Sequence, residues 1–342
     1  MAAISSGWSK PLSGRLRDYA LAPTGTLLLG AVQAHMIKEA AKPSTRRQDV
    51  IHPSEMAKTD WCPRSTYYRI KACREADDAY LKAPEYVGVQ LLNIFDEGHA
   101  IHDKWQRRFW EMGLLWGSYN CLKCNMVYPF QDVKRRCPNE MCQGSMETMT
   151  YHEVPLRAEQ YLISGSADGA IPSKKALIEI KSVGVGTARI EAPDIFKANS
   201  EGQKIDLQGL WKDIKEPFPS HVRQGQLYLR LCHIMGLDYD RIVFIYESKF
   251  NQGAKEFVVK FDPVFCDDML HSCLEINGAL EYGLEIPLCP TGTSCKDCEQ
   301  YGNEKSDSVR VGNTEEPEPE RIESSGDTGR RNPRPSGRFV RS

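Results

Sequence analysis

The chain has 342 residues, of which 41% are hydrophobic and 26% are charged, and its formal net charge is −2. This length suffices for one large domain or two modest ones. The near-neutral charge excludes a histone-like binder of nucleic acid, but it does not exclude a local basic groove. No apolar run approaches a membrane span, and TLLLGAV (26–32) is too short for a signal peptide, so we expect no membrane partner.

The predicted elements begin with a helix at 26–42, inside an N-terminal extension of residues 1–50 whose first 25 residues lack periodicity. A helix follows Cys62-Pro63-Arg64, and a long helix spans about 86–116. One face of the long helix is expected to be buried, because its apolar residues recur every three or four positions. These residues are Leu91, Ile94, Phe95, Ile101, Trp105, Phe109, Met112 and Trp116.

Strands are expected near 151–158, 161–171 and 176–183. A helix at 221–235 would open at Ser220 as its N-cap and stop at Gly236. A β-hairpin at 241–262 and a last helix at 263–282 follow. Residues 303–342 are poor in apolar side chains and predict a disordered, charged tail.

The segment SADGAIPSKKALIEIKS (166–182) predicts a hairpin about Pro172-Ser173-Lys174-Lys175. If Ile171 pairs with Ala176, counting outward puts Asp168 opposite Glu179. Opposed like charges destabilise a sheet unless a divalent cation neutralises them. Lys181 shares the face of Glu179 and would place a cation beside the two carboxylates. The alternative is an exposed hairpin that carries a cross-strand charge cluster.

GSADGAI, EIK and the order helix, strand, acidic hairpin, helix, strand resemble the PD-(D/E)XK nuclease fold. The resemblance implies an α/β fold with a restriction-endonuclease-like core, in which a mixed central sheet is flanked by helices. Mg²⁺ or Mn²⁺ would be bound by Asp168 and Glu179, and the backbone carbonyl of Ile180 could complete the metal sphere.

Two helix motifs resemble those of the RecB-like branch of this family. Gly98 and His102 form G-x-x-x-H on the long helix, which implies that His102 is a metal ligand and that Gly98 permits close approach of a backbone. Gln224 and Tyr228 form Q-x-x-x-Y, which implies contacts that position DNA and support the site. A core histidine and a plain helix surface are the alternatives.

Cys62 lies far upstream of Cys289, Cys295 and Cys298, and this arrangement resembles the iron–sulfur RecB-like nucleases, including the CRISPR-associated exonucleases. The resemblance implies a [4Fe–4S] cluster that ties together the two ends of a nuclease domain at 51–302. The C-x5-C-x2-C spacing departs from the more usual C-x2-C-x5-C, so zinc stays an alternative. Cys73 is a substitute candidate for Cys62.

Four further cysteines predict an inserted zinc ribbon at 119–144, because a small insert without a core of its own needs a metal. They follow the pattern C-x2-C-x12-C-x4-C: Cys121, Cys124, Cys137 and Cys142.

The motifs together predict a metal-dependent DNA nuclease, and the resemblance implies an exonuclease on single-stranded or frayed DNA ends in replication, recombination or repair. A helicase or a recombination or replication protein is the expected partner, since the chain has no Gly-x4-Gly-Lys-Ser/Thr phosphate loop of its own. The expected location is the cytoplasm of a prokaryote or of a phage-infected host. The alternatives are a structure-specific endonuclease on the same site and a non-catalytic zinc-ribbon adaptor that binds nucleic acid.

Overall fold

The computed structural model describes residues 28–42, 46–75, 88–132, 134, 136–202, 204–292 and 295–299. The chain divides into two units, one comprising residues up to 46 together with 82–99, and the other comprising 47–81 and 100–342. The first contains α2 (Leu29–Ala40) and the start of α5 (Val89–Glu111). The start of the extension and the predicted tail at 303–342 lie outside the described residues. Within the described part, no helix is both long and apolar enough to cross a membrane.

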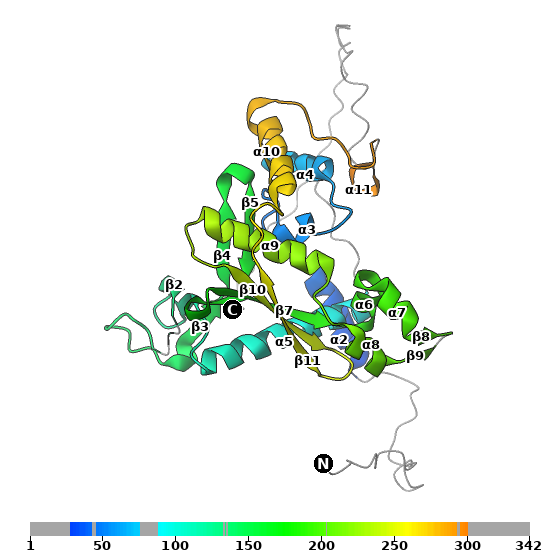
Figure 1. The fold of residues 1–342 in the computed structure, drawn as a ribbon. Coiled ribbons are helices and arrows are strands. Elements are labelled where there is room, and N and C mark those ends of the chain that lie inside the picture. Colours follow the sequence, from blue (N-terminus) through cyan, green and yellow to red (C-terminus); the bar gives the residue numbers. More distant parts are fainter. Residues whose placement is uncertain are drawn as a thin grey trace, which may run out of the picture. The chain divides into compact units, whose positions relative to one another are not determined.

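A mixed four-stranded sheet forms the centre of the larger unit, in the order β11-β10-β7-β6 (Figure 1). Its strands are β6 (Gly169–Ile171), β7 (Ala176–Val183), β10 (Arg241–Ser248) and β11 (Ala254–Lys260). The pair β7–β10 is parallel, and the other two pairs are antiparallel. A parallel pair needs a crossover, and the chain between these strands supplies it with helices. The crossover contains α6 (Val185–Glu191), α7 (Pro193–Ala198), α8 (Leu207–Asp213), α9 (Pro219–Ile234) and the short β8 (Ser200–Glu201) and β9 (Lys204–Ile205).

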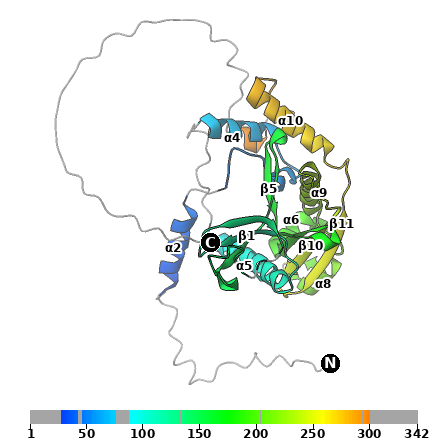
Figure 2. The ribbon, with the colours of Figure 1, turned by 90° about the vertical axis from the view of Figure 1, so that its left-hand side faces the viewer.

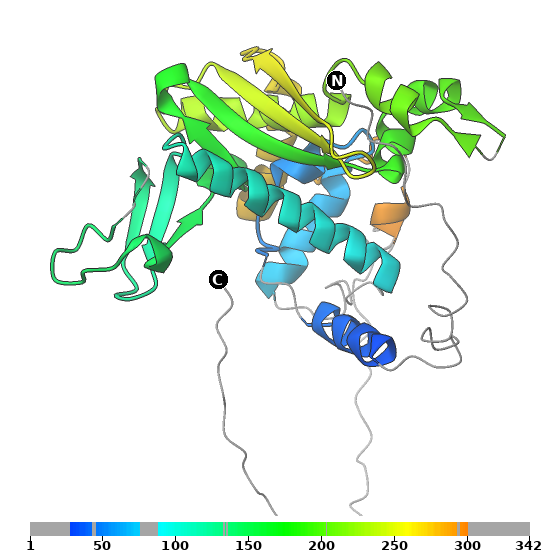
Figure 3. The ribbon, with the colours of Figure 1, turned by 90° about the horizontal axis from the view of Figure 1, so that it is seen from below.

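The two faces of this sheet are covered by different helices, because β7 has apolar residues on both sides. Ile178 and Ile180 form a buried cluster with Ile101 of the C-terminal half of α5. Figure 3 shows α5 running along this sheet. Leu177 belongs to the larger core on the opposite face, which α9 supplies with Leu227 and other residues. The site residues of β7 therefore lie between two helices.

Two smaller sheets and a group of helices complete the unit. One sheet has the order β2-β1-β3, from β1 (Gly117–Cys121), β2 (Val127–Gln131) and β3 (Met149–His152). The other pairs β4 (Val154–Ala158) with β5 (Ile163–Ala167). Helix α4 (Pro63–Glu75) packs on α10 (Asp267–Tyr282) and α11 (Lys296–Glu299), as Figure 2 shows for α4 and α10. The short α3 (Pro53–Met56) contacts α9. Segments from the start and the end of this unit thus lie side by side.

Several sequence expectations need correction. The predicted strand at 151–158 is two strands, which separate at Glu153. Helix α9 begins one residue before the predicted cap Ser220, with Phe218 as N-cap, because Pro219 suits the first helical position and needs no hydrogen-bond partner for its nitrogen.

The predicted buried face of the long helix is correct only in part. Ile101 is buried, and Trp105 and Phe109 are half-buried against the sheet, but Trp116 lies beyond the end of the helix. Four apolar residues of the predicted face are instead exposed, by 43% to 65%: Leu91, Ile94, Phe95 and Met112. Periodicity reports an apolar stripe, but it does not tell how much of the stripe a sheet covers.

Two separate glycine-to-alanine variants test the contact between α9 and the sheet. A Cβ on Gly225 would lie 2.8 Å from Cζ of the fully buried Phe244 and 3.0 Å from Cγ2 of Ile242, so Gly225→Ala should lower the free energy of unfolding by about 1–3 kcal/mol. A Cβ on Gly186 in α6 would meet nothing within 4 Å, so Gly186→Ala should leave it unchanged or raise it slightly. Urea unfolding of both variants measures the difference, and equal stabilities would contradict the close packing of α9.

Candidate active site

The acidic hairpin has the predicted register, with Ile171 opposite Ala176 and Gly169 opposite Ile178. Its turn is a short 3-10 segment, Pro172–Lys174, followed by Lys175 in the left-handed region. The β6–β7 ladder ends at Gly169, so Asp168 lies one residue beyond it, between β5 and β6. The carboxylate of Asp168 still reaches β7, because its Oδ2 accepts a hydrogen bond from the backbone N–H of Ile180 (2.6 Å).

Glu179 holds a buried carboxylate with one oxygen unpaired. Only 4% of the residue is exposed. Its Oε1 accepts from Lys181 Nζ (2.9 Å) and from Gln224 Nε2 (3.1 Å), whereas Oε2 is buried and has no hydrogen-bond partner among the described residues. A buried charged oxygen without a partner is costly, and a cation beside it would remove that cost.

The pKa of Glu179 is shifted in the direction expected for such a site. Burial, opposed by the charge of Lys181 and aided by that of Asp168, raises the pKa of Glu179 to about 7. The ionised carboxylate is therefore disfavoured here unless a further cation stabilises it.

His102 lies next to Asp168, with Nδ1 3.2 Å from Oδ1. Burial works to lower the pKa of His102, but the neighbouring Asp168 prevails and raises it. The backbone carbonyl of Asp168 accepts from Gln106 Nε2 (3.0 Å) and from the hydroxyl of Tyr151 (3.1 Å), which fixes the aspartate between α5 and β3. The structure thus brings His102 and Asp168 together from positions 66 residues apart.

Gln224 and Tyr228 also join this group. The side-chain Oε1 of Gln224 accepts from Lys181 Nζ (2.8 Å), and its Nε2 donates to the hydroxyl of Tyr228 (2.8 Å) as well as to Glu179. Every polar atom of the Gln224 amide therefore has a partner, in one consistent orientation. Gly98 precedes His102 by one turn of α5, and its role stays a prediction, as does that of the Ile180 carbonyl.

Sequence reasoning missed a third carboxylate, Glu153, which accepts a hydrogen bond from Ser166 Oγ. Burial raises the pKa of Glu153, and the adjacent Asp168 raises it further. The only signal in the sequence was one acidic residue inside a predicted strand. The buried Asp168 and Glu179 and the half-buried Glu153 consequently share this part of the larger unit, beside His102 and Lys181.

Sequence reasoning also missed the ion pair that holds α5 on the sheet. Glu247 of β10 is 1% exposed, and its carboxylate accepts from Lys104 Nζ and from Trp105 Nε1 (2.7 Å). These donors follow His102 by two and three residues on the same helix. The pair therefore sets the position from which His102 reaches Asp168.

The terminal cysteines gather as predicted. Cys62, Cys289, Cys295 and Cys298 have all four sulfurs within 4.8 Å of one another, so the group could hold a metal ion. The separations are 3.9 Å from Cys62 to Cys289 and 3.7 Å from Cys295 to Cys298. Cys73, the substitute candidate, does not belong to this group.

The insert gathers its four cysteines in the same way. The Sγ atoms of Cys121 and Cys142 lie 3.6 Å apart, as do those of Cys124 and Cys137, and this group too could hold a metal ion. A Cβ on Gly144 would lie 3.0 Å from Cys121 Sγ, so a glycine is needed for the chain to pass this close to the sulfurs.

Comparisons with known proteins give structural likenesses of low score. No protein-family model and no curated protein sequence matches the chain. An alkaline exonuclease from Laribacter hongkongensis, LHK-Exo, is 12% identical over 73% of this chain and 93% of its own, with a TM-score of 0.39. Its complex with dAMP has 11% identity over the same shares and a TM-score of 0.36. The structure of SSO0001 is 13% identical over 77% of this chain and 89% of its own, with a TM-score of 0.33. Likenesses of this size do not establish a shared fold or activity.

The charge of Glu179 should weaken the protein when no divalent metal is added. Because its pKa is raised when folded, the folded state binds more protons than the unfolded state between about pH 4.5 and pH 7, and stability falls as pH rises through that range. Glutamine does not ionise, so the variant Glu179→Gln should not lose stability in this way as pH rises. We expect its Tm to exceed that of the wild type at pH 8 and to match it near pH 4.5. The exposed Glu256→Gln is the control, and a Tm difference that does not change with pH would contradict this account.

Proposed function

We propose that the protein is a metal-dependent DNA nuclease of the PD-(D/E)XK superfamily, in its RecB-like branch. The observation that carries the proposal is the buried, unpaired Oε2 of Glu179, whose other oxygen accepts from Lys181 and whose chain neighbour Ile180 donates its N–H to Asp168. Two carboxylates and an imidazole suit Mg²⁺ or Mn²⁺, and their unsatisfied oxygen supports a cation at this position.

The residues that would hold the metal are Asp168, Glu179 and His102, with the carbonyl of Ile180 as a further oxygen donor. When bound, such a metal polarises a phosphodiester and lowers the pKa of water. The chain's own contribution is to keep these ligands in place. The Ile180 N–H holds Asp168, Gln224 and Lys181 hold Glu179, and the α5 ion pair holds His102.

Lys181 is the residue that we assign to the reacting phosphate. Its Nζ is fixed by Glu179 and Gln224, so the ammonium has a defined position without being neutralised completely. In that position it can orient the attacking water and stabilise the negative charge that develops on the phosphate oxygens. Gln224 and Tyr228 support Lys181 and Glu179 and position the strand.

The proposed substrate is DNA with a single-stranded or frayed end, which is cut as an exonuclease cuts it. The chain would work with a helicase or a recombination or replication partner. A structure-specific endonuclease would use the same residues, and the products distinguish the two activities. The non-catalytic adaptor would bind DNA without cutting it.

We further propose that both cysteine groups hold zinc. Four thiolates around one tetrahedral Zn²⁺ at about 2.3 Å lie about 3.8 Å apart. The measured separations of 3.6 to 3.9 Å match this at both groups. A [4Fe–4S] cluster binds each thiolate to a different iron atom and needs the sulfurs farther apart, so the sulfur positions at Cys62, Cys289, Cys295 and Cys298 favour the zinc alternative.

Cleavage of end-labelled DNA tests the nuclease proposal. Wild type, Glu179→Gln and Glu256→Gln are incubated with single-stranded and duplex DNA in Mg²⁺, Mn²⁺ or EDTA. We expect metal-dependent cleavage by the wild type and by Glu256→Gln, and a loss of about 100-fold or more in Glu179→Gln, because metal ligands contribute several kcal/mol to such reactions. Short products released progressively from one end identify an exonuclease, and internal cuts identify an endonuclease. Cleavage by Glu179→Gln at the wild-type rate would refute the assigned site, and binding without cleavage by the wild type would establish the adaptor.

Metal analysis of anaerobically purified protein tests the thiolate groups. We expect two zinc ions per chain, no iron and no absorption near ~400 nm. Cys298→Ser should remove one ion and destabilise the packing of α4 on α11, whereas Cys232→Ser, at a buried cysteine outside both groups, should keep both ions. Four iron atoms per chain would contradict the zinc assignment.

A further inference from the structure

His221 lies in the first turns of α9, three residues before Gln224 and seven before Tyr228, and so shares the helix face that meets the active site. Its ring stacks on Phe244, with 6.5 Å between the centroids, and meets the ring of Tyr246 at 5.3 Å. Tyr246 is the β10 neighbour of Lys181 in the parallel pair. His221 therefore lies on the Lys181 side of the site, and none of the roles assigned above uses it.

The hydrogen bonds of Tyr246 fix the tautomer of His221. The hydroxyl of Tyr246 accepts from the backbone N–H of Phe218 (2.8 Å), and it contacts Nδ1 of His221. Tyr246 is fully buried, and its hydroxyl is satisfied. Among the described residues, Nδ1 of His221 is the acceptor within its reach, so the hydroxyl donates to an unprotonated Nδ1.

The remaining proton of the ring is thereby placed on Nε2. Burial and then the charge of Lys181 lower the pKa of His221 to about 2, so the ring is neutral at physiological pH. Nε2 has no partner among the described residues, and it is not among their buried unsatisfied atoms, so it borders open space. The half-buried His221 thus presents one N–H donor of fixed orientation.

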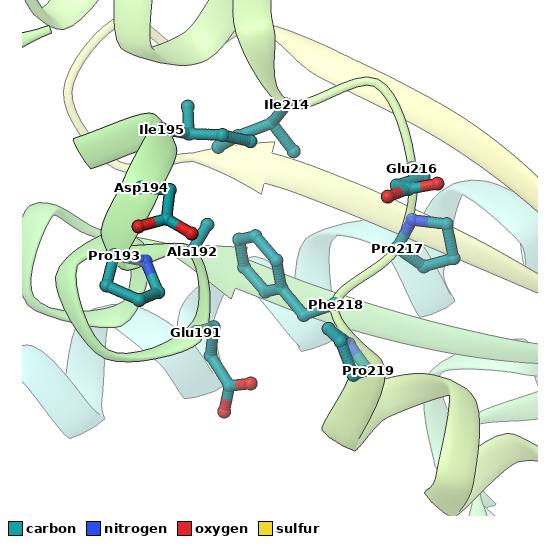
Figure 4. Close-up of a pocket in the computed structure, with 10 residues that line it drawn as sticks. All are labelled: Glu191, Ala192, Pro193, Asp194, Ile195, Ile214, Glu216, Pro217, Phe218 and Pro219. Atoms are coloured by element: carbon teal, nitrogen blue, oxygen red, sulfur yellow. The ribbon is translucent and has the colours of Figure 1, made fainter. Parts of the chain in front are cut away.

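The cavity at the N-terminus of α9 is unsuited to a phosphate. A cavity there, shown in Figure 4, has the ring of Phe218 at its centre and three carboxylates, Glu191, Asp194 and Glu216, along its lining. Ser220 Oγ already donates to Glu191 Oε2 (2.7 Å). His221 packs its ring on Phe218, with 5.4 Å between the centroids, but does not line this cavity, so the three carboxylates disfavour an anion within the cavity and leave His221 as the donor outside it.

We infer that His221 is a substrate-binding residue whose Nε2–H donates to a phosphate oxygen of the bound DNA strand, next to the phosphate that Lys181 meets. The inference rests on the proposed function, which supplies the DNA strand. A neutral donor is suited to this place because it adds a directional hydrogen bond without adding a second positive charge beside Lys181.

The test measures the binding of fluorescein-labelled single-stranded DNA in Ca²⁺, with single phosphates replaced in turn by neutral methylphosphonate. In the wild type, one replacement should weaken binding about tenfold or more, as expected for a lost hydrogen bond to a charged group. His221→Phe, which keeps a ring on Phe244, should bind intact DNA more weakly than the wild type by a similar factor. Replacing the same phosphate by methylphosphonate should then cause this variant no further loss of affinity. His221→Gln, which can place an N–H near Nε2, should recover part of the loss.

His233→Phe is the matched control, because His233 lies at the other end of α9 and its ring contacts Phe261. The His233→Phe variant should lose affinity at the same methylphosphonate positions, and by the same factors, as the wild type. The inference is overturned if His221→Phe also keeps that response, or if the wild type binds no DNA. A wild type that shows the expected binding pattern but cuts no DNA in Mg²⁺ or Mn²⁺ refutes the nuclease proposal alone.

Discussion

The arrangement of the site depends on one electrostatic constraint, the burial of the Glu179 carboxylate with half of its hydrogen-bonding capacity unmet. Oε2 is not exposed to bulk solvent, and Lys181 is bonded to the other oxygen and to Gln224. Such a group destabilises a fold unless something else compensates for it. Asp168 and Glu153 add negative charge to the same place. The accumulation is unfavourable for folding and favourable for capturing a small cation, as is typical of sites shaped by function.

The two helices on either side of β7 have different tasks. Helix α5 is fixed by the pair Lys104–Glu247 and brings His102 to Asp168. Helix α9 packs through Gly225 on β10 and presents Gln224 to Glu179 and Lys181, with Tyr228 one turn later as a partner of Gln224. Strand β7 between them is apolar apart from Glu179, Lys181 and Ser182, so the polar groups on each side have few alternative partners on it. This scarcity of partners is what makes the geometry specific.

The sequence predicted the local parts of this arrangement and missed those that depend on distant packing. The hairpin register followed from strand alternation and one turn, and the inserted cysteine group followed from its spacing, because these constraints act over short stretches. The grouping of Cys62 with the terminal cysteines, and the inclusion of His102 and Gln224, were implied by the resemblance to RecB-like nucleases. Glu153, Glu247 and His221 carry no such local signal. Their partners Asp168, Lys104 and Tyr246 lie on other elements, and only the three-dimensional arrangement identifies them. The wrong prediction of burial for the exposed apolar residues of α5 has the same cause, because periodicity shows an apolar face but does not specify the surface that packs on it.

The contact of Cys62 with Cys289 joins positions 227 residues apart, and the whole central sheet lies in the chain between them. With a metal at this group, that stretch of chain becomes a closed ring. Tension applied to the chain after Cys298, for example by a protein tethered there, would load the metal–thiolate bonds before it reached β7 or α9. The proposed site residues on these elements would then be mechanically insulated from a pull on that end of the chain.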